Sequence, residues 1–202
     1  MKIVIFGDSI VWGAGLPFRT AWANLLRNFL EKRNKKYSPV ELYDLGIDRD
    51  TTEELLKRFD IEIEARHPNV IIFAVGINDS AYRRNKNNPL VTVKKFESNL
   101  LKLINKAKKL TDKIILIGIS KGNDKTTIPL LRSTTGKCYD KENVRIYNEI
   151  IKKVCKKENT SFINISGSLS DKDFYDGLHP NSAGHKKIFE IVKDFLIENK
   201  II

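Results

Sequence analysis

The sequence predicts an α/β protein, a three-layer α/β/α sandwich around a five-stranded parallel sheet, and two patterns support this prediction. Short apolar runs rich in β-branched residues are typical of strands covered on both faces, and they occur at 2–6, 40–45, 70–75, 114–119 and 161–165. Stretches with helical apolar periodicity predict amphipathic helices at 21–33, 52–65, 91–110, 141–157 and 182–199. Strand and helix therefore alternate along the whole chain.

This alternation also predicts how the layers are arranged. Parallel neighbours need a long connection between them, and helices must cover both faces of such a sheet. The topology that satisfies both conditions here is a flavodoxin-like, doubly wound sheet. Ligands of such sheets bind beyond the carboxyl ends of the strands, so we expect the chemistry in the loops that follow the strands.

The length and composition predict a single domain over residues 1–202, since a hydrophobic content of 41% is enough for one core. The first residues run directly into a turn, without the apolar stretch and small-residue cleavage site of a signal peptide. No apolar run approaches the ~18 residues that cross a bilayer. Only two cysteines occur, Cys138 and Cys155, and neither belongs to a C-x-x-C pair. We therefore expect a cytoplasmic protein without a membrane span.

A formal net charge of +11 raises the alternative of a non-catalytic basic module that binds an anionic ligand or nucleic acid. The lysines, however, are spread over predicted helix faces among acidic residues, which is typical of a solvated surface. The loops after the strands lack the interleaved aromatic and basic residues that stack bases. We expect no nucleic-acid partner, and the sequence does not indicate an oligomeric state.

The first predicted strand runs directly into Gly7-Asp8-Ser9. Gly7 permits a tight turn that exposes the serine hydroxyl above the sheet, which is where a nucleophile would lie. The same tripeptide is also common at helix starts, because aspartate and serine are frequent N-caps. Ser9 becomes a candidate nucleophile only in combination with other motifs.

Near the carboxyl end, Asp176 stands three residues before His179, just ahead of the last predicted helix. A serine hydroxyl needs a base to remove its proton, and an imidazole titrates in the right pH range. Asp176 would hold the His179 tautomer and stabilise the imidazolium. The structural alternative is a surface histidine beside two capping groups.

Two further strand ends carry candidate donors for an oxyanion hole. Gly46 follows the second predicted strand, and Asn78 follows the third. The backbone N–H groups of Ser9 and Gly46, together with the Asn78 amide, would supply three donors to a developing oxyanion.

These motifs, taken in order, resemble those of the SGNH (GDSL-type) hydrolase family: Gly7-Asp8-Ser9, Gly46, Gly76-x-Asn78-Asp79 and Asp176-x-x-His179-Pro180. The resemblance implies a flavodoxin-like fold and the hydrolysis of esters or thioesters through an acyl-enzyme, without a metal or cofactor. It also implies a triad of Ser9, His179 and Asp176, with Ser9, Gly46 and Asn78 in the oxyanion hole.

The second motif departs from the family pattern Asn-x-Gly-x-x-Gly, because Asp44 stands where asparagine is usual and Arg49 where the second glycine is usual. The shape of this loop is therefore open. We expect Arg49 to pair with Asp48 or Asp50, with an acidic ligand as the alternative.

Other acids and histidines compete for roles in the site. Asp173 is a rival triad acid, although it lies six residues from His179. His67 precedes the third strand, so it belongs at the opposite end of the sheet. His185 is expected on the surface of the last helix. Asp8 and Asp79 are expected in structural roles.

The leading hypothesis is hydrolysis of a small or medium carboxylic ester, such as an acetylated sugar, a lysophospholipid, a thioester or a simple ester. The polar, basic loops at 80–89 and 121–139 favour a polar or short-acyl substrate. The basic run 83–86 is expected to be solvated, with contact to a substrate anion as the alternative. A set of apolar residues after Ser9 is expected mainly in the core, with an acyl pocket as the alternative: Trp12, Leu16, Pro17, Phe18 and Trp22.

Overall fold

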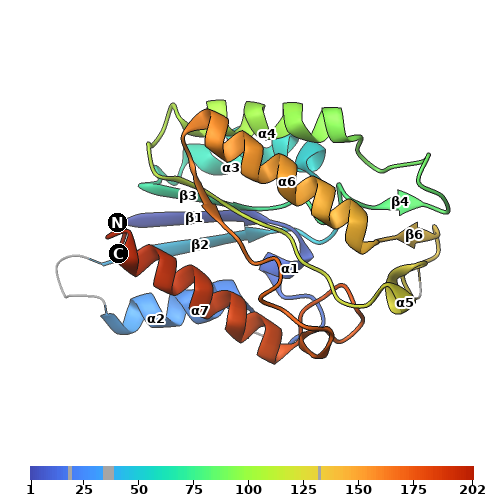
Figure 1. Ribbon diagram of the computed structural model, residues 1–202. Helices are drawn as coiled ribbons and strands as arrows, with labels where there is room; N and C mark the ends of the chain where they lie inside the picture. The colour runs from blue at the N-terminus through green and yellow to red at the C-terminus, as the bar shows by residue number, and fades with distance from the viewer. Residues whose placement is uncertain (18–19, 34–38, 132) are drawn as a thin grey trace.

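Five strands form one parallel sheet in the order β2-β1-β3-β5-β7 in the computed structural model (Figure 1). The structure describes residues 1–17, 20–33, 39–131 and 133–202. The strands are β1 (Lys2–Gly7), β2 (Glu41–Gly46), β3 (Val70–Ala74), β5 (Ile114–Ile117) and β7 (Ser161–Ile163). Since β1 lies inside the sheet and the strand order reverses beside it, the predicted flavodoxin-like, doubly wound sheet is confirmed.

Helices cover both faces of this sheet (Figure 1). One face carries α2 (Trp22–Arg33) and α7 (Ser182–Glu198), and the other carries α3 (Thr52–Glu64), α4 (Val93–Ala107) and α6 (Lys141–Glu158). The bounds of these five helices lie within a few residues of those predicted from periodicity. The predicted three-layer sandwich is therefore confirmed as well.

Strand β1 is buried on both sides, as its continuous apolar run predicts. Ile3 and Ile5 pack into the core layer under α2 and α7, whereas Val4 and Phe6 pack into the opposite layer. All four side chains are fully buried. Burial of each such side chain contributes about 1.5–3 kcal/mol, so the strand that carries the Ser9 turn is firmly held.

Several short elements were not predicted from the sequence, because segments of two to four residues are too short to show a periodicity of apolar residues. They are α1 (Ser9–Trp12), β4 (Tyr82–Arg83), α5 (Asp124–Thr127), β6 (Lys137–Cys138) and the 3₁₀ helix η1 (Asp171–Asp173). Strands β4 and β6 pair antiparallel in a small second sheet beyond the carboxyl ends of the main strands (Figure 1). This small sheet forms one wall of the candidate site.

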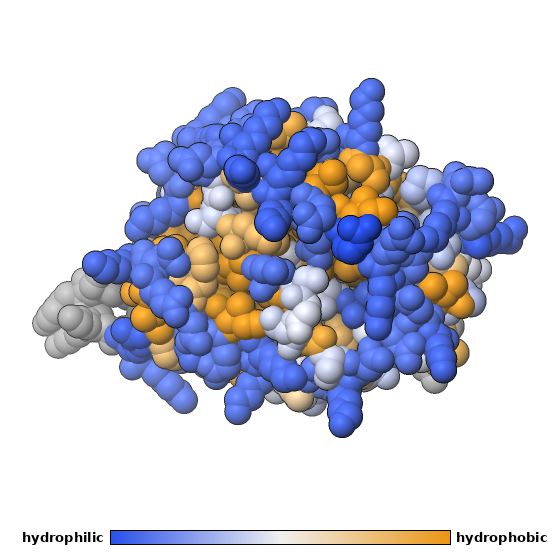
Figure 2. All heavy atoms as spheres, in the orientation of Figure 1, coloured by the Kyte–Doolittle hydropathy of each residue, from blue (hydrophilic) through white to orange (hydrophobic). Residues whose placement is uncertain are grey.

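The surface is mainly hydrophilic on the face that Figure 2 shows, as the charged composition of the chain predicts. Figure 2 shows one face covered largely by hydrophilic side chains, with smaller hydrophobic areas between them. Within the described ranges, no helix combines the length and the apolar character that crossing a bilayer requires.

The expectation that His185 lies on the surface is wrong. The side chain is fully buried between α7 and α2, and its Nδ1 accepts a hydrogen bond of 3.1 Å from the Trp22 backbone N–H. His185 belongs to the inward stripe of α7, three residues before Ile188 and seven before Val192. Its polar side chain was taken as a sign of exposure, whereas helical spacing places it in the core.

Burial makes His185 a source of acid sensitivity, because it lowers the pKa of the imidazole from 6.5 to about 4, with a smaller contribution from His179. Below pH 6.5 the unfolded chain takes up a proton that the folded chain resists until about pH 4. Folding therefore loses about 3 kcal/mol of stability from this group as the pH falls through that window. His185→Asn keeps an acceptor for Trp22 but does not titrate.

The measurement is the free energy of urea unfolding for wild type and His185→Asn between pH 7 and pH 4. We expect the difference between the two curves to change by about 3 kcal/mol across this range, to the advantage of the variant at low pH. His67→Asn, at an exposed histidine, is the matched control and should follow wild type. Parallel curves for wild type and His185→Asn would contradict the buried neutral histidine.

Candidate active site

Ser9 is the first residue of α1 and follows a sharp turn at the end of β1. A Cβ on Gly7 would lie 2.1 Å from the Val11 side chain, so only glycine fits there. Asp8 caps α1, its Oδ1 accepting a hydrogen bond of 2.9 Å from the Ile10 N–H. The turn places Ser9 just beyond the carboxyl end of β1, as predicted.

A hydrogen-bonded chain joins the three residues predicted as a triad. Ser9 Oγ lies 3.1 Å from His179 Nε2, and His179 Nδ1 lies 2.8 Å from Asp176 Oδ2. The Tyr175 ring stacks on the imidazole with a centroid distance of 5.7 Å. The imidazole is therefore held between the serine and the carboxylate with one nitrogen toward each, as a general base requires.

The loop around Asp176 fixes the carboxylate as well as the histidine. Asp176 Oδ1 accepts backbone hydrogen bonds of 2.9 Å from Leu178 and 2.7 Å from His179, while Oδ2 contacts the imidazole. Burial raises the pKa of Asp176, but the hydrogen bonds from the His179 side chain and from these backbone groups outweigh it, so the pKa lies below its usual value. Asp176 is thus an ionised carboxylate at neutral pH.

The rival acid, Asp173, is engaged elsewhere. Its Oδ2 accepts hydrogen bonds from the N–H and the hydroxyl of Ser170 and from Lys187 Nζ, at 2.7, 2.9 and 2.7 Å. The geometry therefore pairs His179 with Asp176.

Asn78 is held by two neighbours at the carboxyl end of β3. Its Nδ2 donates to the Asp50 carbonyl at 3.0 Å, and its Oδ1 accepts a hydrogen bond of 2.9 Å from the Tyr139 hydroxyl. Burial raises the pKa of Tyr139, so the phenol remains a donor at neutral pH. The orientation of the Asn78 amide is thereby fixed, with one N–H of Nδ2 available to a ligand.

Gly46 lies against the Ser9 turn, because β1 and β2 pair in register from Lys2 with Glu41 to Gly7 with Gly46. A Cβ at Gly46 would lie 2.5 Å from the Trp12 backbone nitrogen, which excludes any larger residue. The Gly46 N–H already donates to Asp44 Oδ1 at 3.0 Å.

Asp44, which stands where the motif usually has asparagine, therefore already accepts a hydrogen bond from the Gly46 N–H, one of the three predicted oxyanion donors. An oxyanion would have to share the Gly46 N–H with Asp44. The N–H of Ser9, the first of α1, has no hydrogen-bond partner among the described residues.

Residues that motif analysis did not single out hold these loops together. Arg58 donates to the carbonyls of Gly7 and Leu45, at 3.2 and 2.9 Å, and pairs with Asp50 at 2.6 Å. It ties the ends of β1 and β2 to the loop that contacts Asn78. Helical spacing alone gave no signal for this role, since an arginine on α3 is ordinarily solvated.

The acids beside the site have the structural roles predicted for them. Asp79 accepts hydrogen bonds from the backbone N–H of Thr52, at 3.1 and 3.0 Å, and from its hydroxyl at 2.5 Å, so it anchors the start of α3. Burial raises the pKa of Asp8 and of Asp79 to about 7. Arg49 pairs with Asp48 at 3.4 Å, as expected.

Ser9 and His179 open into a cleft of about 360 Å³ between the main sheet and the small β4–β6 sheet. Most of the residues that line it are polar, but leucines also contribute apolar surface; the lining includes Asn78, Thr134, Thr135, Tyr139, Leu130, Leu131, Asp48, Arg49, Arg83 and Lys137. The cleft can accept a polar molecule and hold it against the serine.

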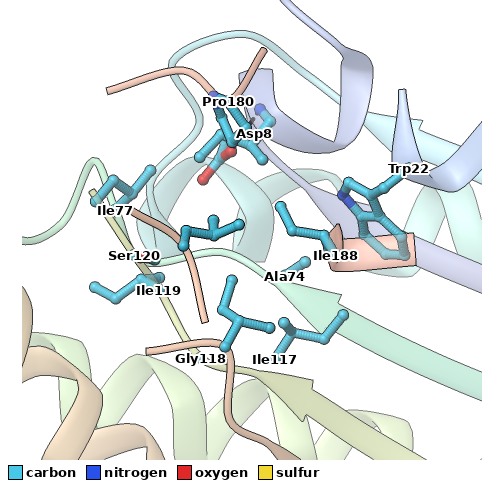
Figure 3. A pocket seen from close by; sticks show the side chains of 13 residues that line it. Asp8, Trp22, Ala74, Ile77, Ile117, Gly118, Ile119, Ser120, Pro180 and Ile188 are labelled. Atoms are coloured by element: carbon cyan, nitrogen blue, oxygen red, sulfur yellow. Dashed lines mark hydrogen bonds between the residues drawn. The ribbon is translucent and has the colours of Figure 1, made fainter. Parts of the chain in front are cut away.

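A second, apolar cavity of about 30 Å³ lies behind the Ser9 turn (Figure 3). Figure 3 shows Asp8 beside Pro180 at one end and Trp22 and Ile188 at the other. Trp22 is a core residue, as favoured from the sequence, whereas Trp12 is 60% exposed. Trp12, Leu16 and Pro17 line a separate surface pocket, and Phe18 lies outside the described residues.

In the parts of the chain that the structure describes, no group of three or more histidine, cysteine or acidic side chains is arranged to hold a metal ion. Both cysteines are buried and unpaired.

Comparison with known proteins identifies the family. Residues 5–187 match the GDSL-like Lipase/Acylhydrolase family. YqeF of Bacillus subtilis (strain 168), an uncharacterized lipoprotein, is 30% identical over 131 residues, 61% of this chain and 51% of its own. The chain thus aligns with about half of that relative's length.

Two longer matches agree. The GDSL esterase/lipase WDL1 of rice (Oryza sativa subsp. japonica) is 23% identical over an alignment of 219 positions, covering 96% of this chain and 77% of WDL1. The acetylxylan esterase Axe2 of Geobacillus stearothermophilus has the same fold, with a TM-score of 0.73 and 20% identity over 98% of this chain and 93% of Axe2. The chain belongs to the GDSL-like lipase/acylhydrolase family of ester hydrolases, as its motifs predicted.

Proposed function

We propose that this protein hydrolyses small, polar carboxylic esters through an acyl-enzyme formed on Ser9. The observation that carries the proposal is the chain of contacts from Ser9 Oγ to His179 Nε2 and from His179 Nδ1 to Asp176, at 3.1 and 2.8 Å. Such a chain converts a weakly nucleophilic hydroxyl into a nucleophile at neutral pH.

In the first half-reaction, Ser9 Oγ attacks the ester carbonyl carbon while His179 Nε2 takes the hydroxyl proton. The tetrahedral intermediate collapses, the bond to the alcohol oxygen breaks, and His179 returns the proton to the leaving alcohol. In the second half-reaction, His179 takes a proton from water, which attacks the acyl carbon and releases the acid and free Ser9. Asp176 stabilises the imidazolium in both halves.

The oxyanion of each tetrahedral intermediate would accept hydrogen bonds from the free Ser9 N–H and from Asn78 Nδ2, with the Gly46 N–H shared with Asp44. Preorganised donors of this kind are worth roughly 10²–10³-fold in kcat each. Tyr139 supports this role indirectly, because its hydrogen bond of 2.9 Å holds the Asn78 amide in the donating orientation.

Two further facts support the proposal. Structures of Axe2 described as catalytic mutants carry alanine in place of a serine, a histidine and an aspartate, the same three residue types that meet here. Most residues that line the cleft are polar or charged, which suits an acetyl or other short acyl ester better than a long lipid chain.

The test is hydrolysis of p-nitrophenyl acetate, butyrate and octanoate by the purified protein. We expect kcat/KM to be highest for the two short chains and at least about tenfold lower for octanoate, since polar and charged side chains outnumber apolar ones in the lining of the cleft. Heat-unfolded protein is the control, because surface lysines react slowly with activated esters. Hydrolysis no faster than this control, or a preference for octanoate, would contradict the proposal.

A further inference from the structure

Two cations face each other across the small sheet that walls the cleft. Arg83 of β4 and Lys137 of β6 are directly opposed partners of the antiparallel pair, so their side chains project from the same face. The neighbouring pair, Tyr82 and Cys138, points to the other face and is buried. Both cations line the cleft that contains Ser9.

Like charges at directly opposed positions destabilise a strand pair unless an anion lies between them. In the described part of the chain, neither the Arg83 guanidinium nor the Lys137 ammonium has an ion-pair partner within 4.0 Å, a distance at which sixteen other pairs occur. Other lysines and arginines of the described residues also lack such a partner, but Arg83 and Lys137 oppose each other in one strand pair and line the cleft that contains Ser9. This pair is left unneutralised.

A third cation reaches the same cleft. Arg49 also lines it, and its only acidic neighbour there, Asp48, is already engaged with it at 3.4 Å. Lys137 is half-buried, and burial together with the charges of Arg49 and Arg83 lowers the pKa of its ammonium group. The lining of the cleft therefore carries two positive charges in excess of its acids.

We propose that the ester which occupies this cleft carries an anionic group, a carboxylate or a phosphate, that binds between Arg83 and Lys137. The inference rests on the proposed function, because the same cleft presents Ser9 to the ester carbonyl. The forked guanidinium of Arg83 and the ammonium of Lys137 can together bind the oxygens of a planar carboxylate or a tetrahedral phosphate. The cations would select and orient the substrate, while Ser9 and His179 perform the reaction.

The experiment compares two matched aryl acetates, 4-acetoxybenzoate and the neutral 4-acetoxybenzamide. We expect wild type to favour the carboxylate by about tenfold in kcat/KM, with the preference shrinking in 0.5 M salt. In the double variant Arg83→Gln/Lys137→Gln the preference is expected to disappear. Lys102→Gln, at an exposed lysine on α4 outside the cleft, is the control for loss of a distant positive charge and should retain it.

A second arm uses 4-acetoxyphenyl phosphate, and the anion with the higher kcat/KM in wild type is the one that the site prefers. Hydrolysis of the acetate ester of neutral 4-acetoxybenzamide by wild type tests the proposed esterase function independently of the anion site. Equal kcat/KM for charged and neutral esters in wild type, or an equal loss of preference in Lys102→Gln, would overturn the anion site while leaving the esterase intact.

Discussion

Ser9→Ala is expected to lower kcat for p-nitrophenyl acetate by about 10⁴-fold or more. The variant keeps the cleft, the Asn78 amide and the Ser9 backbone N–H, so substrate binding and oxyanion stabilisation remain. It loses the atom that forms the acyl-enzyme. We therefore expect the loss in kcat, with KM changed little, measured by steady-state release of p-nitrophenol.

The matched control is Ser80→Ala. Ser80 is also buried in a loop that follows a strand, but its hydroxyl donates to the Ile77 carbonyl at 2.7 Å and not to the imidazole. The kcat of Ser80→Ala is expected to stay within about threefold of wild type, because the Ser80 hydroxyl contacts the Ile77 carbonyl and does not line the cleft; the lost hydrogen bond should cost only about 1 kcal/mol of stability. Similar rates for Ser9→Ala and Ser80→Ala would mean that another group attacks the ester.

Asp176→Asn is expected to lower kcat by about 10⁴-fold, because an amide cannot stabilise the imidazolium and favours the wrong tautomer of His179. The loop should keep its shape, since the asparagine Oδ1 can still accept the N–H groups of Leu178 and His179, now at 2.9 and 2.7 Å. The measurement is kcat between pH 6 and pH 9, where the loss should persist.

Asp173→Asn is the control for Asp176→Asn. It shows whether the loss of kcat is specific to the carboxylate that contacts His179 or follows from removing any carboxylate in this segment. Asp173 binds Ser170 and Lys187, so its loss should reduce stability, visible as a lower midpoint of thermal unfolding, while kcat falls by less than about tenfold. The reverse ranking of the two variants in kcat would assign the triad acid to Asp173.

The fold was predictable because its main strands and helices are long enough to show a period. The runs at 2–6 and 70–75 are apolar apart from Lys2, and a strand buried on both faces requires that pattern. The short elements β4, β6, α1 and α5 were missed, since two to four residues carry no periodicity. They form through pairing with distant segments, which no local window contains.

The candidate site was predictable where the chemistry needs fixed spacing within a loop. Asp176 and His179 are three residues apart, so one turn places them in contact. Their approach to Ser9, 170 residues earlier in the chain, depended on the fold and on the family resemblance.

The supporting contacts were not predictable from the sequence. Tyr139 contacts Asn78, and Arg58 contacts the ends of β1 and β2. Both contacts join residues far apart in the sequence, and both involve residue types that are common on surfaces. His185 was predicted wrongly because its residue type was given more weight than its position on the helix. Its residue type suggested exposure, while its position on the inward stripe of α7 decided burial.

The central claim is that Ser9 becomes covalently bound, and the most direct test is mass spectrometry after treatment with a fluorophosphonate, which traps activated serines. The expected result is one adduct per chain, on the peptide that contains Ser9, and no adduct in Ser9→Ala. An adduct on another residue, or undiminished ester hydrolysis by protein that carries the Ser9 adduct, would contradict the nucleophilic role of Ser9.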